Sequence, residues 1–371
     1  MSARQALAAL RLSHFRSHLQ MSLALDGRPV VLFGPNGAGK TNILEAVSLL
    51  SPGRGLRRAL AEELMQREKA IGWKIAAEVW TADQTYEIDL TAEPDQPRQT
   101  RIDGKQQPQT ALARLVRVLW LIPAMDRLWI EGAEGRRRFL DRMTLSFVPD
   151  HAEASLRYEK AMRDRNRLLK DGVSDTHWYQ AVEAQMAAAG AQVAAARRQT
   201  LSELAAAQTG AATAFPAGNL SITGPEGISQ SETEAELRAA FEASRPRDML
   251  AGRTLVGPHR ADLEAIFAAK GVAARLCSTG EQKALLISLI LANARALKTQ
   301  IGVAPLLLLD EVAAHLDADR RAALYDEICA LGAQAFLTGT DKALFTDLGD
   351  RAAAYAVSER DGNSQLQETD L

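Results

Sequence analysis

The sequence contains few cysteines and few aromatic residues. Of its 371 residues only 2 are cysteine, and aromatic residues make up 5%. Cys277 and Cys329 lie far apart and form no metal-ligand spacing, and so low a count is atypical of a disulfide framework. We therefore expect no structural disulfide and a cytoplasmic location.

Long apolar runs are also lacking. The N-terminus has no apolar segment of the kind found in signal peptides, and the longest apolar run, Ala284–Ala292, is too short to cross a bilayer. These absences predict a chain that is neither exported nor membrane-spanning.

The chain has no excess of charge of either sign. Lys and Arg number 44, Asp and Glu number 46, and the formal net charge is −2. This balance argues against a uniformly basic nucleic-acid binder, so any DNA contact must come from a local patch or from a surface built by dimerisation. A hydrophobic content of 47% over this length is typical of a globular protein with two or three structural units.

Residues 1–123 are expected to form the first part of an α/β domain. Val30–Phe33 has the apolar composition of a buried strand, while Ile75–Val79 and Tyr86–Leu90 alternate like half-buried strands.

Residues 124–212 are expected to form an inserted helical arm. Their composition is charged and helix-favouring, and one helix is expected over about 178–205, roughly 40 Å long. Its apolar residues recur in steps of three and four, the seam of a helix that packs against an antiparallel neighbour. These seam residues are Tyr179, Val182, Met186, Ala189, Val193 and Ala196.

Residues 213–371 return to an α/β pattern and are expected to complete the first domain. The expected strands are Leu220–Thr223, Leu263–Phe267, Pro305–Leu309 and Ala335–Thr338. The predicted fold class is therefore α/β, with an inserted helical arm.

A glycine-rich segment after the first expected strand matches the phosphate-binding P-loop pattern. Such a loop points its backbone N–H groups at phosphates, Lys40 would reach the β and γ phosphates, and the Thr41 hydroxyl would bind Mg²⁺. The alternative is a structural glycine-rich turn, but a strand precedes the match and an apolar-faced helix follows it. The expected ATP-binding residues are Gly34, Pro35, Asn36, Gly37, Ala38, Gly39, Lys40, Thr41 and Asn42.

A second motif follows the aliphatic strand Pro305–Leu309. Asp310 and Glu311 come directly after it, so the strand would deliver Asp310 to the metal and Glu311 to the attacking water. Two carboxylates could also mark a solvated strand end. In a chain with a P-loop we expect Glu311 and Lys40 to be catalytic and Thr41 and Asp310 to bind Mg²⁺.

A third motif, Ser278-Thr279-Gly280-Glu281-Gln282, opens an apolar helix. Such a segment is a common helix cap, yet its serine, glycine and helix N-terminus could also bind a γ-phosphate. The order of P-loop, helical insertion, this segment and the Asp-Glu strand removes the ambiguity. That order resembles the ABC ATPase head, in which the signature sequence of one subunit completes the ATP site of the other.

The resemblance to ABC heads implies an ATP-dependent homodimer, with Ser278, Gly280, Glu281 and Gln282 acting in trans. Ala314–Asp317 looks like the loop that communicates across such a dimer. No clear glutamine loop is present, and the strand Phe336–Thr340 ends without the histidine found in many transporters. Thr338 or Thr340 are therefore candidates for sensing the γ-phosphate.

Four further segments resemble the RecF family of bacterial DNA replication and repair proteins, which is related to SMC-type heads. They are Leu12–Arg16, Gly53–Arg57, Glu134–Asp141 and Gly257–Leu263. The resemblance covers nearly the whole chain, and it departs at Ala261, where the family usually has a second aspartate. It implies a slow ATPase that binds gapped or junction DNA as a dimer and works with RecR and RecO to help load RecA.

Candidate DNA contacts follow partly from this resemblance. Arginines cluster after the P-loop helix and at the start of the arm, where they could bind phosphates. For the stretch Arg157–Lys170, a solvated helix face paired with nearby carboxylates is the favoured alternative. The candidates are Arg54, Arg57, Arg58, Arg136 and Arg137.

Two other functions share parts of this pattern. The ATPase subunit of a membrane transporter has the same head, but transporter heads contain a compact helical subdomain rather than a charged arm. A metabolic P-loop kinase would leave Ser278–Gln282 without a role.

Overall fold

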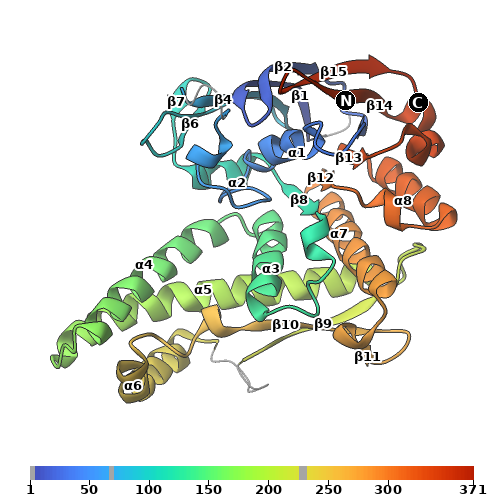
Figure 1. Cartoon of the computed structure of the whole chain (residues 1–371). Helices are drawn as coiled ribbons and strands as arrows, with labels where there is room; N and C mark the ends of the chain where they lie inside the picture. The colour runs from blue at the N-terminus through green and yellow to red at the C-terminus, as the bar shows by residue number, and fades with distance from the viewer. Residues whose placement is uncertain (1–4, 67–70, 225–231) are drawn as a thin grey trace. The chain divides into compact units, whose positions relative to one another are not determined.

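The computed structural model describes residues 5–66, 71–224 and 232–371. Contacts divide the chain into two compact units, both assembled from separate stretches of sequence. Unit 1 comprises Met1–Asp126, Gly210–Pro216 and Ser278–Leu371, and unit 2 comprises Arg127–Thr209 and Ala217–Cys277. The colours of Figure 1 follow the chain from unit 1 into unit 2 and back.

An antiparallel sheet forms one layer of unit 1, with the strand order β2-β1-β4-β5-β6-β7. Buried and exposed residues alternate along β4, as expected for a sheet with one face on the core. The strands expected at Ile75–Val79 and Tyr86–Leu90 are confirmed as parts of β4 and β5. The strand bounds are β1 Ala6–Phe15, β2 His18–Ala24, β4 Trp73–Trp80, β5 Thr85–Ala92, β6 Gln99–Ile102 and β7 Lys105–Gln106.

A mostly parallel sheet forms the second layer, with the order β15-β14-β3-β13-β12-β8. Only β15 runs antiparallel to its neighbour. All four residues of β12 are buried, because a central parallel strand is covered on both faces. The bounds are β3 Val30–Phe33, β8 Val118–Leu121, β12 Leu306–Leu309, β13 Ala335–Gly339, β14 Ala353–Arg360 and β15 Asn363–Thr369.

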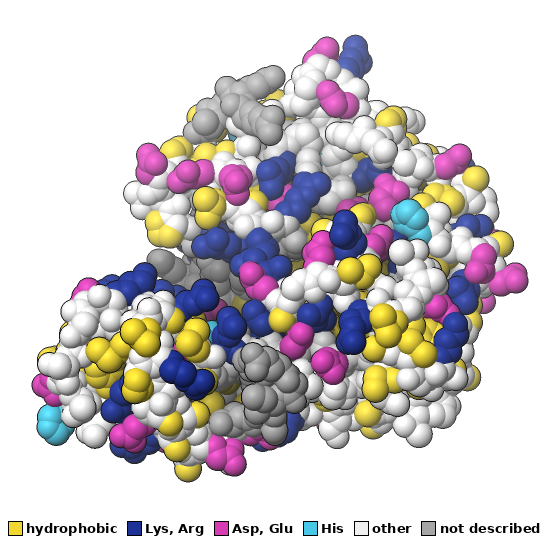
Figure 2. Space-filling model, turned by 60° about the horizontal axis from the view of Figure 1, so that its bottom comes forward, with side chains coloured by type: hydrophobic (Ala, Val, Ile, Leu, Met, Phe, Trp, Pro, Cys, Tyr) yellow, Lys and Arg dark blue, Asp and Glu magenta, His cyan; other side chains and the backbone are white. Residues whose placement is uncertain are grey.

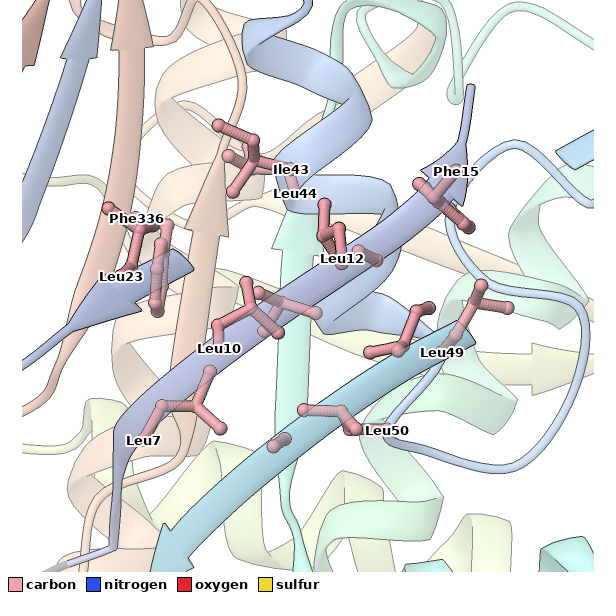
Figure 3. Close-up of a cluster of buried hydrophobic side chains, with 14 of the residues drawn as sticks. Leu7, Leu10, Leu12, Phe15, Leu23, Ile43, Leu44, Leu49, Leu50 and Phe336 are labelled. Carbon is pink, nitrogen blue, oxygen red and sulfur yellow. The ribbon is translucent and has the colours of Figure 1, made fainter. Parts of the chain in front are cut away.

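The main core of unit 1 lies between these two sheets and the helix α1 (Lys40–Ser48). Figure 3 shows Leu7, Leu10 and Leu12 along β1 in the same buried cluster as Ile43 and Leu44 of α1. Burial of each such side chain stabilises the fold by about 1.5–3 kcal/mol. The packing therefore fixes α1, and with it the loop that precedes this helix.

The long helix α7 is largely buried in unit 1. By length and composition it could cross a membrane, but 72% of its most apolar window is buried inside the protein, as is usual for a core helix. It contacts β8 and α8. The remaining bounds in unit 1 are α2 Leu112–Leu115, α7 Thr279–Ile301, α8 Ala318–Leu331, η1 Glu62–Leu64, η2 Gln109–Ala111, η3 Pro123–Met125, η7 Ala313–His315 and η8 Lys342–Arg351.

In its described residues, unit 2 combines four α-helices with a small antiparallel sheet of order β11-β10-β9. The helices α4 and α5 form a hairpin, and α6 lies along α5 (Figure 1). The bounds are α3 Ala133–Phe147, α4 His151–Lys170, α5 Thr176–Gln208, α6 Glu234–Ala251, β9 Gly218–Thr223, β10 Asp262–Phe267, β11 Val272–Ala273, η5 Pro258–Arg260 and η6 Ala274–Leu276.

The expected seam along α5 is confirmed. Met186 and Ala189 are buried against Tyr158 of α4 and Phe241 of α6, and Val182 packs beside them half-buried. The antiparallel neighbour predicted from the spacing is α4.

The expected third segment, 213–371, is divided between the two units. Residues 217–277 belong to unit 2, because β9 contacts α5, α6 packs on α5, and β10 packs on α3. The strands at Leu220–Thr223 and Leu263–Phe267 exist as expected, but they pair with each other rather than with the P-loop sheet.

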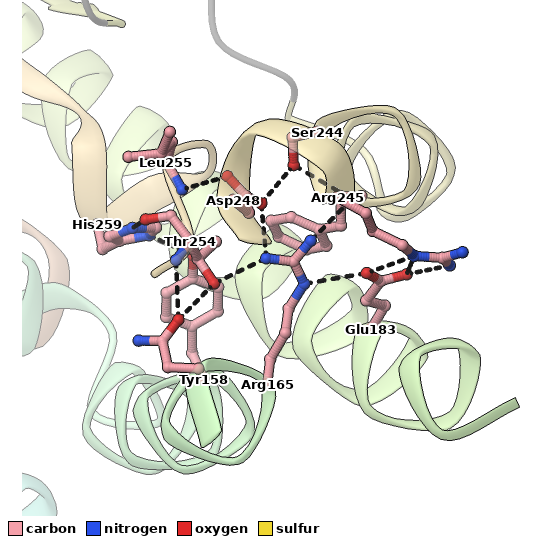
Figure 4. Close-up of polar contacts among 11 residues, drawn as sticks. Tyr158, Arg165, Glu183, Ser244, Arg245, Asp248, Thr254, Leu255 and His259 are labelled. Atoms are coloured by element: carbon pink, nitrogen blue, oxygen red, sulfur yellow. Dashed lines mark hydrogen bonds and ion pairs between the residues drawn. The ribbon is translucent and has the colours of Figure 1, made fainter. Parts of the chain in front are cut away.

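A buried polar cluster holds unit 2 together around Arg165 (Figure 4). The Arg165 guanidinium is 0% exposed and donates to Glu183 Oε1 at 3.0 Å and to Asp248 Oδ2 at 2.7 Å. It also donates to the Thr254 hydroxyl at 2.9 Å and to the Phe241 carbonyl at 2.8 Å. The cluster therefore ties α4, α5 and α6 to the segment that leads into β10.

Candidate functional site

The glycine-rich loop connects β3 to α1, as the sequence predicts. Gly34 has φ 146°, and a Cβ there would lie 2.0 Å from the Val357 carbonyl oxygen of β14. Gly37 has φ 86°, and a Cβ there would meet nothing within 4 Å. Glycine at 34 therefore permits a close approach to β14, while the Gly37 side of the loop is open. Pro35, Asn36 and Gly37 are exposed, whereas Ala38 and Gly39 are buried.

Lys40 begins α1 and its ammonium lies within the loop. Its Nζ donates to the carbonyl oxygens of Gly34 at 2.7 Å and Pro35 at 2.9 Å. The same atom is 3.9 Å from Glu311 Oε1. Burial lowers the pKa of Lys40, and the carboxylates of Glu311 and Asp310 oppose that shift. The ammonium thus lies where the loop amides and the α1 N-terminus also favour an anion.

Thr41 and Asp310 meet beside the loop. The Thr41 hydroxyl lies 2.9 Å from Asp310 Oδ1 and 3.1 Å from Oδ2. Hydroxyl and carboxylate oxygens are the ligands that Mg²⁺ prefers, and it usually takes only one or two from the protein and the rest from phosphate and water. Within the described residues, no group of three or more His, Cys, Asp or Glu could hold a metal by itself. These two residues fit a magnesium ion that is bound together with a nucleotide.

Glu311 follows Asp310 in an uncommon backbone conformation. Its φ is 55°, in the left-handed region that non-glycine residues rarely adopt. Its backbone N–H donates to the Thr338 hydroxyl at 2.9 Å, and that hydroxyl donates to Asp310 Oδ1 at 2.7 Å. Thr338, considered above as a phosphate sensor, therefore bonds to the Asp-Glu pair itself. Thr340, the other candidate, is exposed.

The segment Ser278–Gln282 begins α7, and Ser278, Thr279 and Gly280 are exposed. Ser278 and Glu281 form a capping box, in which each side chain bonds to the backbone N–H of the other. Gln282 is buried. The capping interpretation is therefore correct for Ser278, and a helix N-terminus with an exposed serine and glycine remains accessible at the surface.

A second network surrounds the P-loop helix. Glu45 of α1 is fully buried and accepts two hydrogen bonds from Arg16, at 2.9 and 2.8 Å. Arg57 also binds it, at 3.2 Å, and reaches the amide oxygen of Asn42 at 2.8 Å. The Asn42 amide donates to the Ser17 hydroxyl at 2.8 Å. This network was not predicted, because nothing local to Glu45 marks it as a buried carboxylate.

The candidate DNA contacts fall into two groups. Arg54, Arg57 and Arg58 are exposed after α1. Arg136, in contrast, binds both carboxylate oxygens of Asp262, at 2.7 and 2.8 Å, and its side chain is 13% exposed.

Arg137 donates to the Ala261 carbonyl at 2.7 Å. The α3 arginines therefore join α3 to the start of β10 within unit 2, which is a structural role. On the face drawn in Figure 2, Lys and Arg side chains are interspersed with Asp and Glu side chains.

The Gly257–Leu263 motif is held within unit 2. The His259 Nε2–H donates to the Thr254 carbonyl at 3.1 Å, so His259 Nδ1 accepts from the Tyr158 hydroxyl at 2.7 Å (Figure 4). Burial lowers the pKa of His259 to about 4. A Cβ at Gly257 would lie 2.6 Å from the Tyr158 hydroxyl oxygen. The motif thus docks the segment before β10 onto α4.

The fold and these converging residues define an ABC-type P-loop ATPase head. Residues 6–364 match the family model described as the RecF/RecN/SMC N-terminal domain. The chain is 47% identical over 365 residues to the DNA replication and repair protein RecF of Rhizobium leguminosarum bv. trifolii, which covers 95% of this chain and 97% of that protein. It is also 47% identical over 382 residues to RecF of a Caulobacter species, which covers 96% of this chain and 97% of that protein.

Solved structures show the same fold. A structure of the recombination mediator protein RecF with ATP has a TM-score of 0.83 at 23% identity and covers 100% of both chains. An Smc head domain from Pyrococcus furiosus has a TM-score of 0.57 at 16% identity, with coverage of 99% of this chain and 96% of that one. The chain belongs to the RecF family of DNA replication and repair proteins.

Proposed function

We propose that this chain is an ATP-gated DNA-binding protein of recombinational repair and replication restart. It binds gapped DNA or single-strand/double-strand junctions as a homodimer, and with RecO and RecR it helps to load RecA. Its location is the cytoplasm. The observation that supports this function best is the convergence of Lys40, Thr41, Asp310 and Glu311 in a chain of the RecF family.

ATP binds on the open side of the glycine-rich loop, where Lys40 and the loop amides face the phosphates. Thr41 and Asp310 would hold Mg²⁺, and the bound ion would supply positive charge to offset that of the phosphates. Glu311 accepts a proton from the attacking water. The 3.9 Å distance between Glu311 Oε1 and Lys40 Nζ supports this role, because Lys40 is the residue proposed to bind the γ-phosphate. Hydrolysis is slow and limits how long the protein stays on DNA.

The signature segment completes the site of a second protomer. Ser278 and Gly280 are exposed at the N-terminus of α7, so they are accessible to the γ-phosphate of a partner. Binding of ATP between two protomers then creates the DNA-binding form, with Arg54, Arg57 and Arg58 as candidate phosphate contacts. A transporter subunit has no specific support, because the chain's relatives are DNA repair proteins.

The test measures DNA binding by fluorescence anisotropy with gapped and fully duplex DNA, without nucleotide, with ADP and with ATP. Glu311→Gln prevents turnover, so we expect its ATP-bound form to dimerise and to bind gapped DNA most tightly. Ser278→Arg blocks the trans contact, so it should bind ATP as a monomer and lose the ATP-dependent DNA affinity. Equal DNA binding with and without ATP, or a monomeric Glu311→Gln variant with ATP, would refute the proposal.

A further inference from the structure

Thr338 lies next to the Asp-Glu pair through the register of the parallel sheet. It is on β13, whose Leu337 pairs with Leu309 of β12, so Thr338 is level with Asp310 at the carboxyl end of both strands. Thr338 is 1% exposed. A hydroxyl so deeply buried needs hydrogen-bond partners, because an unpaired one would cost about 1–3 kcal/mol.

The Thr338 hydroxyl forms hydrogen bonds with both Asp310 and Glu311. It accepts from the Glu311 N–H at 2.9 Å and donates to Asp310 Oδ1 at 2.7 Å. A hydroxyl has a single proton to donate, and this one is directed at Asp310. Its proton is thus engaged with Asp310, which argues against Thr338 as a direct γ-phosphate sensor.

The hydrogen bond from the Glu311 N–H to Thr338 stabilises a backbone conformation that is unfavourable for a non-glycine residue. A non-glycine residue in the left-handed region costs about 1–2 kcal/mol, and Glu311 has φ 55°. On the other side the Asp310 N–H donates to the Leu121 carbonyl of β8 at 2.9 Å. Asp310 and Glu311 are thus held from both strands that neighbour β12: by the Leu121 carbonyl of β8 and by the Thr338 hydroxyl of β13.

The structure assigns Thr338 as a positioning residue for ATP hydrolysis: its hydroxyl holds the Glu311 backbone in the conformation that directs the Glu311 carboxylate, and orients Asp310 through the same atom. This assignment rests on the proposed hydrolytic function. Thr338 touches neither nucleotide nor water in this role. Its loss should therefore lower the rate of hydrolysis while ATP remains bound.

The experiment compares Thr338→Val, which keeps the shape and removes the hydroxyl, with Thr338→Ser, which keeps the hydroxyl. Thr346→Val, at an exposed threonine of η8, is the control. For each variant kcat and KM for ATP are measured with Mg²⁺, and ATP affinity is measured separately by equilibrium binding. If Thr338→Val does not fold, Thr338→Ala takes its place.

We expect Thr338→Val to lower kcat about tenfold or more, since small displacements of a catalytic group can cost that much. Its ATP affinity should stay within about twofold of the wild type, and Thr338→Ser should recover most of the rate. Equal losses in the Ser and Val variants would overturn the assignment, because they would indicate packing alone. Lost ATP affinity at an unchanged kcat would also overturn it, in favour of phosphate sensing.

The outcome separates this assignment from the proposed function. A wild type that hydrolyses ATP, beside a Thr338→Val variant with the same kcat, overturns the positioning role only. A wild type with no more hydrolysis than Glu311→Gln overturns the hydrolytic function and the positioning role together.

Discussion

The hydroxyl of Thr41 meets the carboxylate of Asp310 at 2.9 and 3.1 Å, although the two residues are 269 positions apart in the chain. One follows β3 and the other follows β12, and β13 lies between these strands. Parallel strands bring their carboxyl ends to one edge of the sheet, which is where ligands of open α/β sheets bind. The pairing explains why two motifs so distant in sequence form one site.

Asp310→Asn is expected to lower Mg²⁺-dependent ATP hydrolysis by at least about tenfold, because it removes the charge that binds the metal. The measurement is a Mg²⁺ titration of the ATPase rate, in which the midpoint should also move to higher Mg²⁺. Asp319→Asn, at an exposed position of α8, is the matched control and should leave the titration unchanged. An unchanged midpoint in Asp310→Asn would remove Asp310 from the metal site.

Arg165→Met is expected to destabilise unit 2 by about 3–5 kcal/mol, because it leaves buried Asp248 without its ion-pair partner and removes one of the two arginines that bind buried Glu183. Arg163→Met is the control, since the Arg163 side chain is 65% exposed and pairs with Glu159 one turn away. That variant should stay within about 0.5 kcal/mol of the wild type. Denaturant unfolding measures both, and similar losses in the two variants would contradict the role of the cluster.

The nucleotide site could be predicted because each part of it is a local pattern. Glycines at 34 and 37 are needed where φ is positive, and the aliphatic run before Asp310 is needed where a strand is covered on both faces. The hydrogen bond from the Glu311 N–H to the Thr338 hydroxyl could not be predicted in this way. It depends on the register of β12 and β13, which no short sequence pattern specifies.

The division of the chain was harder to predict than its elements. The strands β9 and β10 were expected from their apolar runs, but a strand pattern does not say which sheet it joins. Their sheet belongs to unit 2, since β9 contacts α5 and β10 contacts α3. The Arg136–Asp262 pair shows the same limit, because an arginine that binds a carboxylate 126 positions away looks like a phosphate contact in sequence alone.

His259 predicts a pH dependence of stability. Its pKa is about 4 in the folded chain, below the ordinary value of 6.5, because burial disfavours the charged ring. The unfolded chain therefore binds more protons between these two values. The stabilisation by neutral His259 is fully present above pH 6.5 and is lost progressively as the pH falls toward 4.

The loss is on the order of 3 kcal/mol, from the size of the shift. Denaturant unfolding between pH 4 and 7 measures it, and His259→Gln should flatten the pH dependence in this window. Tyr158→Phe, which removes the hydroxyl that donates to Nδ1, should destabilise the protein at pH 7. A pH dependence as steep in His259→Gln as in the wild type would assign the effect to other groups.

The two groups of arginines should differ in the salt dependence of DNA binding. Each phosphate contact that is removed flattens the slope of log K against log salt by about 0.9 for duplex DNA. Arg58→Ala is expected to flatten the slope in this way, because Arg58 is exposed after the P-loop helix. Arg136→Ala should leave the slope unchanged and lower stability instead, because its guanidinium binds Asp262.

Both variants remove one positive charge, so a general charge effect would flatten both slopes equally. Anisotropy titrations of gapped DNA at several salt concentrations, with ATP and in the Glu311→Gln background, separate the two cases. An unchanged slope in Arg58→Ala would place the DNA surface elsewhere. A flattened slope in Arg136→Ala would require the bond to Asp262 to open when DNA binds, and Asp262→Asn should then strengthen DNA binding, because it would release Arg136.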